Sequence, residues 1–354
     1  MTGSATRPLG AYVQDDYQTV AEFFDLMPTG VTVSDDGRVF VSFPRWGDEV
    51  PFTVAEVVDG AAVAYPDARV NDWRPGDSAD QLISVQSVVV DPDGYLWLLD
   101  TGAPSFAAHV AGGPKLVRID LAHNAIDRVL RIDDAAMTAQ TYLNDVRFDF
   151  SRGRYAYITD SQPTGAPIVV DLDTGQCWDR LRGHRSTQAE DGFRAVVQGV
   201  VREQYRVGAD GIAISPDGER LFYCPLSSRR LYSVSTQALR DRGIPEDRVA
   251  ETIFDHGDKG ASDGLESDTD GNLYVTAYEH SAVLKKAADG RWTTLLHGPK
   301  LLWPDTLALA ADGHLYVSVN QLPRIPLFND GNEARIPPYL IIRVNVDARP
   351  VRLR

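Results

Sequence analysis

Polar and apolar positions along the chain repeat as one short unit that occurs six times. Each copy begins with a polar residue, continues with a short apolar run and a turn ending in glycine, and is followed by a second apolar run. The turn glycine comes eight positions after the leading residue in five copies and nine positions after it in the third. The copies occupy residues 29–37, 86–94, 144–153, 210–218, 263–271 and 305–313.

Each copy predicts a β-hairpin. Asp-Gly pairs supply the positive φ angles of a tight turn, and the runs that follow, such as 95–99 and 273–276, carry aromatic and branched residues that favour strands. The leading positions lie 42 to 66 residues apart, which leaves room for four short strands per unit. Six such units in constant register predict an all-β fold, a six-bladed β-propeller that forms a single domain over residues 1–354.

The segments between the repeats predict a few further features. The apolar run 339–346 is expected to pair with an N-terminal strand, which would close the ring and hide sheet edges. Residues 236–241 favour a helix, and residues 17–25 fit either a helix or a strand. Two long insertions, 59–81 and 179–208, are expected to form loops on the propeller.

Charge and composition narrow the classes of partner. A net charge of −15 argues against nucleic acid or an anionic membrane as a partner, because both need a basic face. We therefore expect a small-molecule ligand. Two cysteines are too few for a disulfide framework. Because the first ten residues lack a secretory pattern and no run reaches 18 apolar residues, we expect a cytoplasmic protein.

The leading residues are the first candidates for a functional site. In a propeller the innermost strands all begin at one mouth of the central channel, so these six side chains should converge there. They are Thr29, Gln86, Asn144, Asp210, Asp263 and Asp305. The second strand of each blade returns to the same mouth, and its end residues include Asp100, Asp160 and Asn320.

Several carboxylates and amides around one axis indicate a site for a hard cation. Carboxylate and amide oxygens are the ligands that Ca²⁺ prefers, so we expect Ca²⁺ or another divalent cation. The predicted metal ligands are Asn144, Asp210, Asp263 and Asp305. In the alternative, each leading Asp only accepts hydrogen bonds from nearby backbone amides. The acids that recur in the turns are expected to shape those turns at the opposite end.

Other candidate residues lie near the expected mouth. Arg45 and Trp46 follow a second strand and, with Trp303, could form a rim that suits a flat organic ligand. Trp303 could instead pack between blades. His184 lies on a long insertion that could cap the channel, either as a general base or as a residue that packs within its loop. The sequence contains no zinc helix, nucleophile elbow or phosphate-loop motif.

Several stretches resemble the Yellow/major royal jelly protein family, in its bacterial branch. The matching stretches are 27–31, 43–46, 84–88 with 97–102, 142–147 with 157–161, 183–184 and 303–306. The pairing of Leu-Asn-Asp-Val-Arg with Ile-Thr-Asp-Ser is specific. The resemblance implies a six-bladed propeller with a small ligand at the channel mouth, and family activities that range from dopachrome conversion to amine binding. The positions that look similar to the ligand site of the amine binders are Thr306 and Asn320. Gln86, Asp100, Arg147 and Asp160 are further expected ligand contacts.

A more distant resemblance is to the gluconolactonase/senescence marker protein group, six-bladed enzymes that use a channel metal. Asn144 and Asp263 match two of the metal ligands of that group, and Asp210 stands in place of an Asn. Thr29 stands where the group has a Glu, which is a clear departure. Asp305 could supply the missing carboxylate from the next blade.

These observations lead us to expect a lactonase-type hydrolase. An oxygen-bound cation would polarise a carbonyl or activate water, and Asp210, Asp263 and His184 are the candidate catalytic residues. Two alternatives stay open: an isomerase or cyclase acting on a catechol- or indole-like metabolite, and a non-catalytic small-molecule binder. The fold alone does not decide among them.

Overall fold

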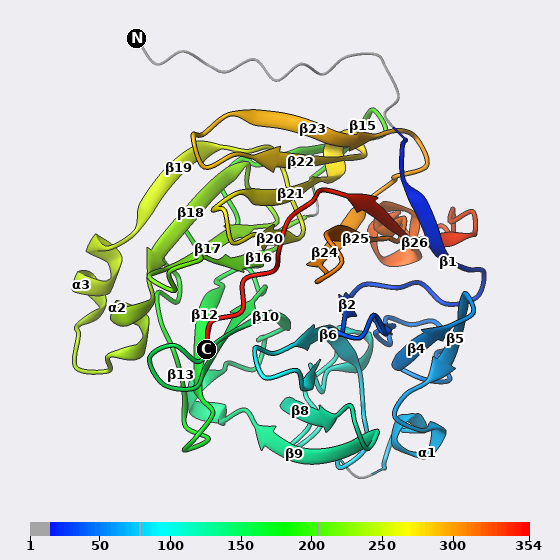
Figure 1. Ribbon diagram of the computed structural model, residues 1–354, viewed down its shortest axis with the longest axis horizontal. Helices are drawn as coiled ribbons and strands as arrows, with labels where there is room; N and C mark the ends of the chain where they lie inside the picture. The colour runs from blue at the N-terminus through cyan, green and yellow to red at the C-terminus, as the bar shows by residue number, and fades with distance from the viewer. Residues whose placement is uncertain (1–14, 78, 204) are drawn as a thin grey trace.

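The computed structural model describes residues 15–77, 79–203 and 205–354. Six four-stranded sheets surround a central axis, and one two-stranded sheet lies outside them (Figure 1). The innermost strands contact one another in a closed ring. The six-bladed propeller expected from the repeat is therefore confirmed.

In the first three blades, four consecutive strands run outward from the axis. Blade one contains β2 (Val31–Val33), β3 (Val39–Ser42), β4 (Val54–Val58) and β5 (Ala61–Ala64). Blade two contains β6 (Val85–Val90), β7 (Leu96–Asp100), β8 (Lys115–Asp120) and β9 (Ala125–Arg131). Blade three contains β10 (Leu143–Asp149), β11 (Tyr155–Asp160), β12 (Ala166–Asp171) and β13 (Cys177–Asp179).

Blades four and five repeat this order, and blade six closes the ring. Blade four contains β16 (Ala209–Ile214), β17 (Arg220–Pro225), β18 (Arg230–Ser235) and β19 (Phe254–Asp258). Blade five contains β20 (Leu265–Ser267), β21 (Leu273–Ala277), β22 (Ala282–Lys286) and β23 (Trp292–His297). Blade six contains β24 (Pro304–Leu309), β25 (His314–Val319), β26 (Tyr339–Asn345) and the N-terminal β1 (Gln18–Phe23).

The ring closes as expected, because β1 pairs with β26 and places Phe23 opposite Tyr339. This pairing also assigns the ambiguous segment 17–25 to a strand. The two chain regions farthest apart in sequence thus share one sheet, which leaves β1 as the outermost strand of blade six.

Helices are short. They are α1 (Ala68–Asn71), α2 (Thr236–Arg240), α3 (Glu246–Glu251) and five 3-10 turns: η1 (Pro104–Phe106), η2 (Asp134–Ala136), η3 (Tyr278–His280), η4 (Leu322–Arg324) and η5 (Pro326–Phe328). The helix expected at 236–241 is present as α2. None of the described helices is long and apolar enough to cross a bilayer.

The two insertions are more ordered than expected. The expectation of a loop over 59–81 is partly wrong, because β5 and α1 both lie within it. The insertion 179–208 contains a hairpin of β14 (Ala195–Val197) and β15 (Val200–Arg202). β5 is the fourth strand of blade one and so belongs to the repeated unit, whereas α1 and the β14–β15 hairpin lie outside it and could not be predicted from the repeat.

The core lies between neighbouring blades. Trp97 of blade two stacks on Phe148 of blade three, with ring centroids 5.3 Å apart. Between blades four and five, Cys224 packs with Leu265. Each blade therefore buries its faces only against its neighbours, which is why the unit must repeat.

Glycines beside the leading residues bring the innermost strands close together. A Cβ on Gly211 would lie 2.1 Å from the carbonyl oxygen of Asp263, and one on Gly264 would lie 2.3 Å from that of Asp305. Only glycine allows this approach. The Asp-Gly pairs that open β16 and β20 therefore place the leading acids of three blades next to one another.

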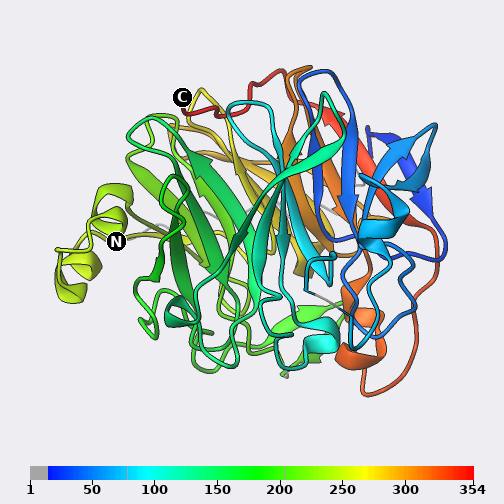
Figure 2. The same cartoon turned by 90° about the horizontal axis from the view of Figure 1, so that it is seen from below.

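The C-terminal segment crosses the opposite end of the propeller. It runs from β26 over the inner strands (Figure 1), on the face that lies opposite η4 and η5 in Figure 2. Pro350 bridges to Asp268, the Leu353 carbonyl accepts from the Phe150 amide at 2.9 Å, and Arg354 Nε donates to the Pro92 carbonyl at 2.7 Å. The segment thus links blades five, three and two.

Candidate functional site

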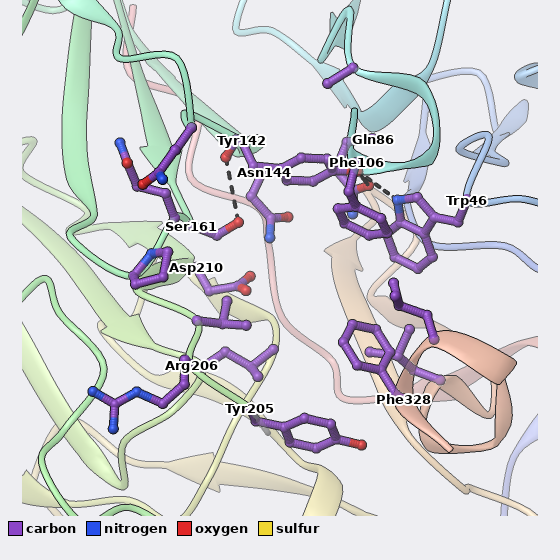
Figure 3. A pocket seen from close by; sticks show the side chains of 18 of the residues that line it. Trp46, Gln86, Phe106, Tyr142, Asn144, Ser161, Tyr205, Arg206, Asp210 and Phe328 are labelled. Carbon is purple, nitrogen blue, oxygen red and sulfur yellow. Dashed lines mark hydrogen bonds between the residues drawn. The ribbon is translucent and has the colours of Figure 1, made fainter. Parts of the chain in front are cut away.

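A pocket of about 310 Å³ opens where the innermost strands begin (Figure 3). Five of the six leading residues line it, namely Gln86, Asn144, Asp210, Asp263 and Asp305. The sixth, Thr29, is buried, and its hydroxyl donates to the carbonyl of Gln86 at 3.0 Å. The structure therefore brings the leading side chains together and gives Thr29 a supporting place beside them.

One wall of the pocket is a stack of three aromatic rings. Phe106 lies between Trp46 and Tyr142, with centroid distances of 5.3 and 4.9 Å (Figure 3). Trp46 Nε1 donates to the Tyr142 hydroxyl at 2.6 Å, and that hydroxyl donates to Gln86 Oε1 at 2.9 Å. These hydrogen bonds link the stacked rings to Gln86, one of the polar leading residues that form the floor of the pocket. Such a surface suits a flat organic ring.

A second group of aromatic rings also borders the pocket. Trp303 stacks on Tyr278 at 4.1 Å, and Tyr205 meets Trp303 and Phe328 edge to face at 5.7 and 5.4 Å. Trp303 lines the pocket, and its Nε1 donates to Asp263 Oδ2 at 2.7 Å. Trp303 therefore lines the pocket and also packs against neighbouring aromatic rings. Both roles expected for it from the sequence, at the pocket rim and in packing between blades, are compatible with its position.

The three acids of the floor differ in their electrostatic surroundings. Burial raises the pKa of Asp263 to about 6, although hydrogen bonds from Trp303 and with Asp210 act in the opposite direction. Burial, followed by the charge of Asp263, raises the pKa of Asp210 and that of Asp305 well above 3.8. At neutral pH, Asp263 is thus the member of the cluster that ionises most easily.

Thr306 and Asn320, the residues predicted to contact the ligand, instead form hydrogen bonds with the carboxyl group of Asp305. Thr306 Oγ1 donates to Asp305 Oδ1 at 3.2 Å, and Asn320 Nδ2 donates to Asp305 Oδ2. Neither Thr306 nor Asn320 lines the pocket. Their contacts orient the carboxyl group that does.

Asp100 and Asp160 reach the same end of the channel but turn into the backbone. Asp100 accepts from the Ile83 and Ser84 amides at 2.7 and 2.9 Å and pairs with Lys115 at 2.8 Å. Asp160 accepts from the Tyr142 amide at 2.9 Å. Neither carboxylate lines the pocket. Their hydrogen bonds to backbone amides instead stabilise the ends of the strands.

Three further candidates also lie outside the pocket. Arg45 donates to the carbonyls of Ile83 and Asn71 at 2.6 and 2.8 Å. His184 Nδ1 is 2.8 Å from Ser186 Oγ, and burial lowers its pKa, which fits the loop-packing reading. Arg147 lines a separate cavity at the other end of the channel.

Sequence reasoning missed several pocket residues. Tyr142 stands two positions before the leading Asn144, so its place near the mouth could have been read from the register. Phe106, Tyr205 and Phe328 lie on connections with no counterpart in the repeat. Nothing in the periodic pattern points to these three rings.

The floor does not form a metal site from acids alone. Within residues 15–77, 79–203 and 205–354, no group of three His, Cys, Asp or Glu side chains is placed to hold one metal ion. The predicted set of Asn144, Asp210, Asp263 and Asp305 lines one pocket, but a cation there would depend on the amide oxygen of Asn144.

Comparison with known proteins identifies similar sequences. A family model described as "Major royal jelly protein" matches residues 83–335. "Protein yellow" of Drosophila pseudoobscura pseudoobscura is 30% identical over 247 residues, which are 65% of this chain and 42% of that protein. The Drosophila melanogaster protein is 30% identical over 243 residues, 64% of this chain and 44% of that protein. The aligned part is thus less than half of these relatives.

Similar solved structures are more distant in sequence. A gluconolactonase from Xanthomonas campestris has a TM-score of 0.56 at 14% identity and covers 94% of this chain and 91% of its own. A luciferin-regenerating enzyme has a TM-score of 0.58 at 12% identity, with 96% and 99% covered. A streptogramin B lyase has a TM-score of 0.54 at 10% identity, with 93% and 96% covered. At such identities these likenesses show the fold alone.

Proposed function

Because the chain belongs to the major royal jelly protein family, we propose that it is a small-molecule isomerase or cyclase that acts on a flat, catechol- or indole-like metabolite by acid–base catalysis. The observation that carries this proposal is the buried acid cluster beneath aromatic walls. Acids whose pKa values are pushed apart by their surroundings are typical of paired acid and base roles.

The two roles follow from the contacts of the acids. Asp263, with a pKa of about 6, is ionised at neutral pH and accepts a hydrogen bond from Trp303. It serves as the base that removes a proton from the substrate. Asp210 has its pKa held well above 3.8 by burial and by the charge of Asp263, and serves as the acid that returns a proton to another substrate atom. The net change is an isomerisation, and no co-reactant is needed.

The pocket also supports a substrate class. Its volume of about 310 Å³ is at the lower end of the range for small-molecule sites. The stacked rings of Trp46, Phe106 and Tyr142 offer a flat apolar surface. The acids of the floor disfavour an anionic group at the inner end. A neutral or cationic aromatic compound fits both features.

A lactonase that uses a divalent cation is the second candidate. Two observations favour it. The predicted metal ligands all line the pocket, namely Asn144, Asp210, Asp263 and Asp305. The Xanthomonas campestris protein of similar fold is described as a gluconolactonase. The lactonase stands second because no three acids among the described residues are placed to hold one metal ion together.

The test is a screen of catechol- and indole-like compounds and of lactones, followed by proton NMR in D₂O with EDTA-treated protein. We expect conversion of a flat aromatic compound, with solvent deuterium incorporated, and no need for added Ca²⁺. Asp263→Asn should lower turnover at least about 100-fold, since general acid–base groups contribute about 10² to 10⁴.

Asp270→Asn is the matched control, because Asp270 lies in the exposed turn at the other end of the same hairpin. It should leave turnover unchanged. Turnover that requires Ca²⁺ would favour the metal-dependent lactonase over the isomerase. Full activity of Asp263→Asn on a substrate found in this way would refute the acid–base proposal.

A further inference from the structure

A second, smaller cavity lies at the opposite end of the channel. Its volume is about 50 Å³, which has room for a monoatomic ion but not for an organic ligand. Many of the residues around it are apolar and belong to the inner strands, including Val31, Val88, Ile214 and Leu307, but polar groups also form much of its surface. Residues 350–352 of the C-terminal segment form part of its wall.

Arg147 is one of the residues that line this cavity. Its side chain is 9% exposed, Nη1 binds Asp145 at 3.0 Å, and Nη2 donates to the Leu265 carbonyl at 2.8 Å. Its Nε is buried and has no hydrogen-bond acceptor among the described residues. A buried guanidinium N–H without an acceptor is costly, so a ligand that accepts from it would be favoured.

Arg352 approaches from the C-terminal segment. Its Nη1 donates to the Val90 carbonyl at 2.5 Å, and Nη2 is 3.7 Å from a carboxylate oxygen of the exposed Asp35. Its Nε is also buried without an acceptor among the described residues. Burial lowers the pKa of Arg352, which indicates that its charge is incompletely compensated.

Two cations and one acid line the cavity. They are the cations Arg147 and Arg352 and one acid, Glu266. Glu266 accepts from the Ser267 amide at 2.8 Å and lies 3.9 Å from Nη2 of Arg147, and its charge also acts on Arg352. Neither Nε has an acceptor among the described residues. Asp145, the other partner of Arg147, does not line the cavity.

We propose that this cavity binds one small, weakly hydrated monovalent anion, such as chloride or bromide, between the Nε groups of Arg147 and Arg352. Partly apolar walls and two N–H donors suit such an ion better than a strongly hydrated one. The ion would fix the C-terminal segment over the end of the channel. This site is separate from the pocket and independent of the proposed reaction.

The test uses sodium bromide as the probe and sodium gluconate, whose anion is too large for the cavity, at equal ionic strength. Thermal or urea unfolding of the full chain should show higher stability in bromide. At about a hundred times the dissociation constant, the folding equilibrium constant should rise about 100-fold. In crystals soaked in bromide, an anomalous peak is expected between Arg147 and Arg352.

Arg352→Gln should abolish the difference between the two salts. Arg354→Gln is the matched control, because Arg354 lies on the same segment and donates to the Pro92 carbonyl but is not among the residues that line the cavity; it should keep the difference. Equal stability of the natural chain in both salts would overturn the proposal. So would a difference that persists undiminished in Arg352→Gln, or a bromide peak only elsewhere.

Discussion

Replacement of Asp263 by Asn should make the folded protein more stable at neutral pH. Asp263 is 6% exposed and lies beside Asp210 and Asp305 in the floor of the pocket. Keeping its carboxylate ionised there costs free energy, chiefly because the site is poorly solvated and to a smaller degree because of the charge of Asp145; the hydrogen bonds from Trp303 and with Asp210 offset only part of that cost. The amide is neutral, has nearly the same shape, and its oxygen can still accept the Trp303 N–H.

The size of the effect follows from the pKa of Asp263. A rise from 3.8 to about 6 corresponds to a cost of about 3 kcal/mol above pH 6. This pKa already includes the hydrogen bond from Trp303, which favours the carboxylate over the neutral acid. We therefore expect Asp263→Asn to raise the free energy of unfolding by up to about 3 kcal/mol at pH 7.

The sign of the pH dependence is opposite to that of a salt-bridged acid. A carboxyl whose pKa is raised by folding stabilises the protein most below its unfolded pKa, and that stability is lost as the pH rises through the folded value. Between about pH 4 and 6, the natural chain should lose stability relative to Asp263→Asn. The three acids titrate together, so the informative quantity is the difference between the two proteins.

Urea unfolding from pH 4 to 8, with Asp270→Asn as the control, measures this difference. A variant that is less stable than the natural chain at pH 7, or a gap that does not grow with pH, would refute the reasoning. Stabilisation that reverses in millimolar Ca²⁺ would instead indicate that the carboxylate binds a cation.

Three further predictions use the same structure. Ca²⁺ in place of EDTA should leave the melting midpoint unchanged; a bound ion would add about 2.7 kcal/mol at a hundredfold excess over its dissociation constant, so a clear rise would favour the lactonase. Phe106→Ala should weaken binding of indole up to about tenfold in calorimetric titration, since ring stacking contributes about 0.5–1.5 kcal/mol, whereas Phe254→Ala, which removes an exposed ring, should not. Lys115→Met should lower the free energy of unfolding by about 3–5 kcal/mol, because it leaves the fully buried Asp100 carboxylate without its cation; unchanged urea unfolding would contradict this.

The fold and the floor of the pocket could be predicted because both follow from the repeat. A constant distance between the leading residue and the turn glycine fixes which residue starts each innermost strand. The glycine that follows Asp210 and Asp263 then allows the neighbouring strand to approach, which brings the acids together. These steps depend on local sequence and on closure of the ring, and both are visible in one chain.

The walls of the pocket could not be predicted in the same way. Phe106 and Phe328 lie on 3-10 turns, and Tyr205 follows the β14–β15 hairpin, all of them outside the repeated unit. Where such a loop places a ring depends on tertiary packing, as in the stack of Phe106 on Trp46 and Tyr142. No period in the sequence encodes that contact.

The end residues of the second strands show why position alone is insufficient. Asp100, Asp160 and Asn320 reach the same mouth as the leading acids, yet each accepts a hydrogen bond from the backbone amide two positions later, at 3.0, 3.2 and 2.9 Å. This local turn directs the side-chain oxygen away from the channel, as Asp and Asn often do where a strand ends. Asp210 and Asp305 lie at the register shifts of β16 and β24, and Asp263 lies two residues before β20; the side chains of all three line the channel pocket. The conformation that follows each acid therefore decides whether it serves the pocket or the backbone.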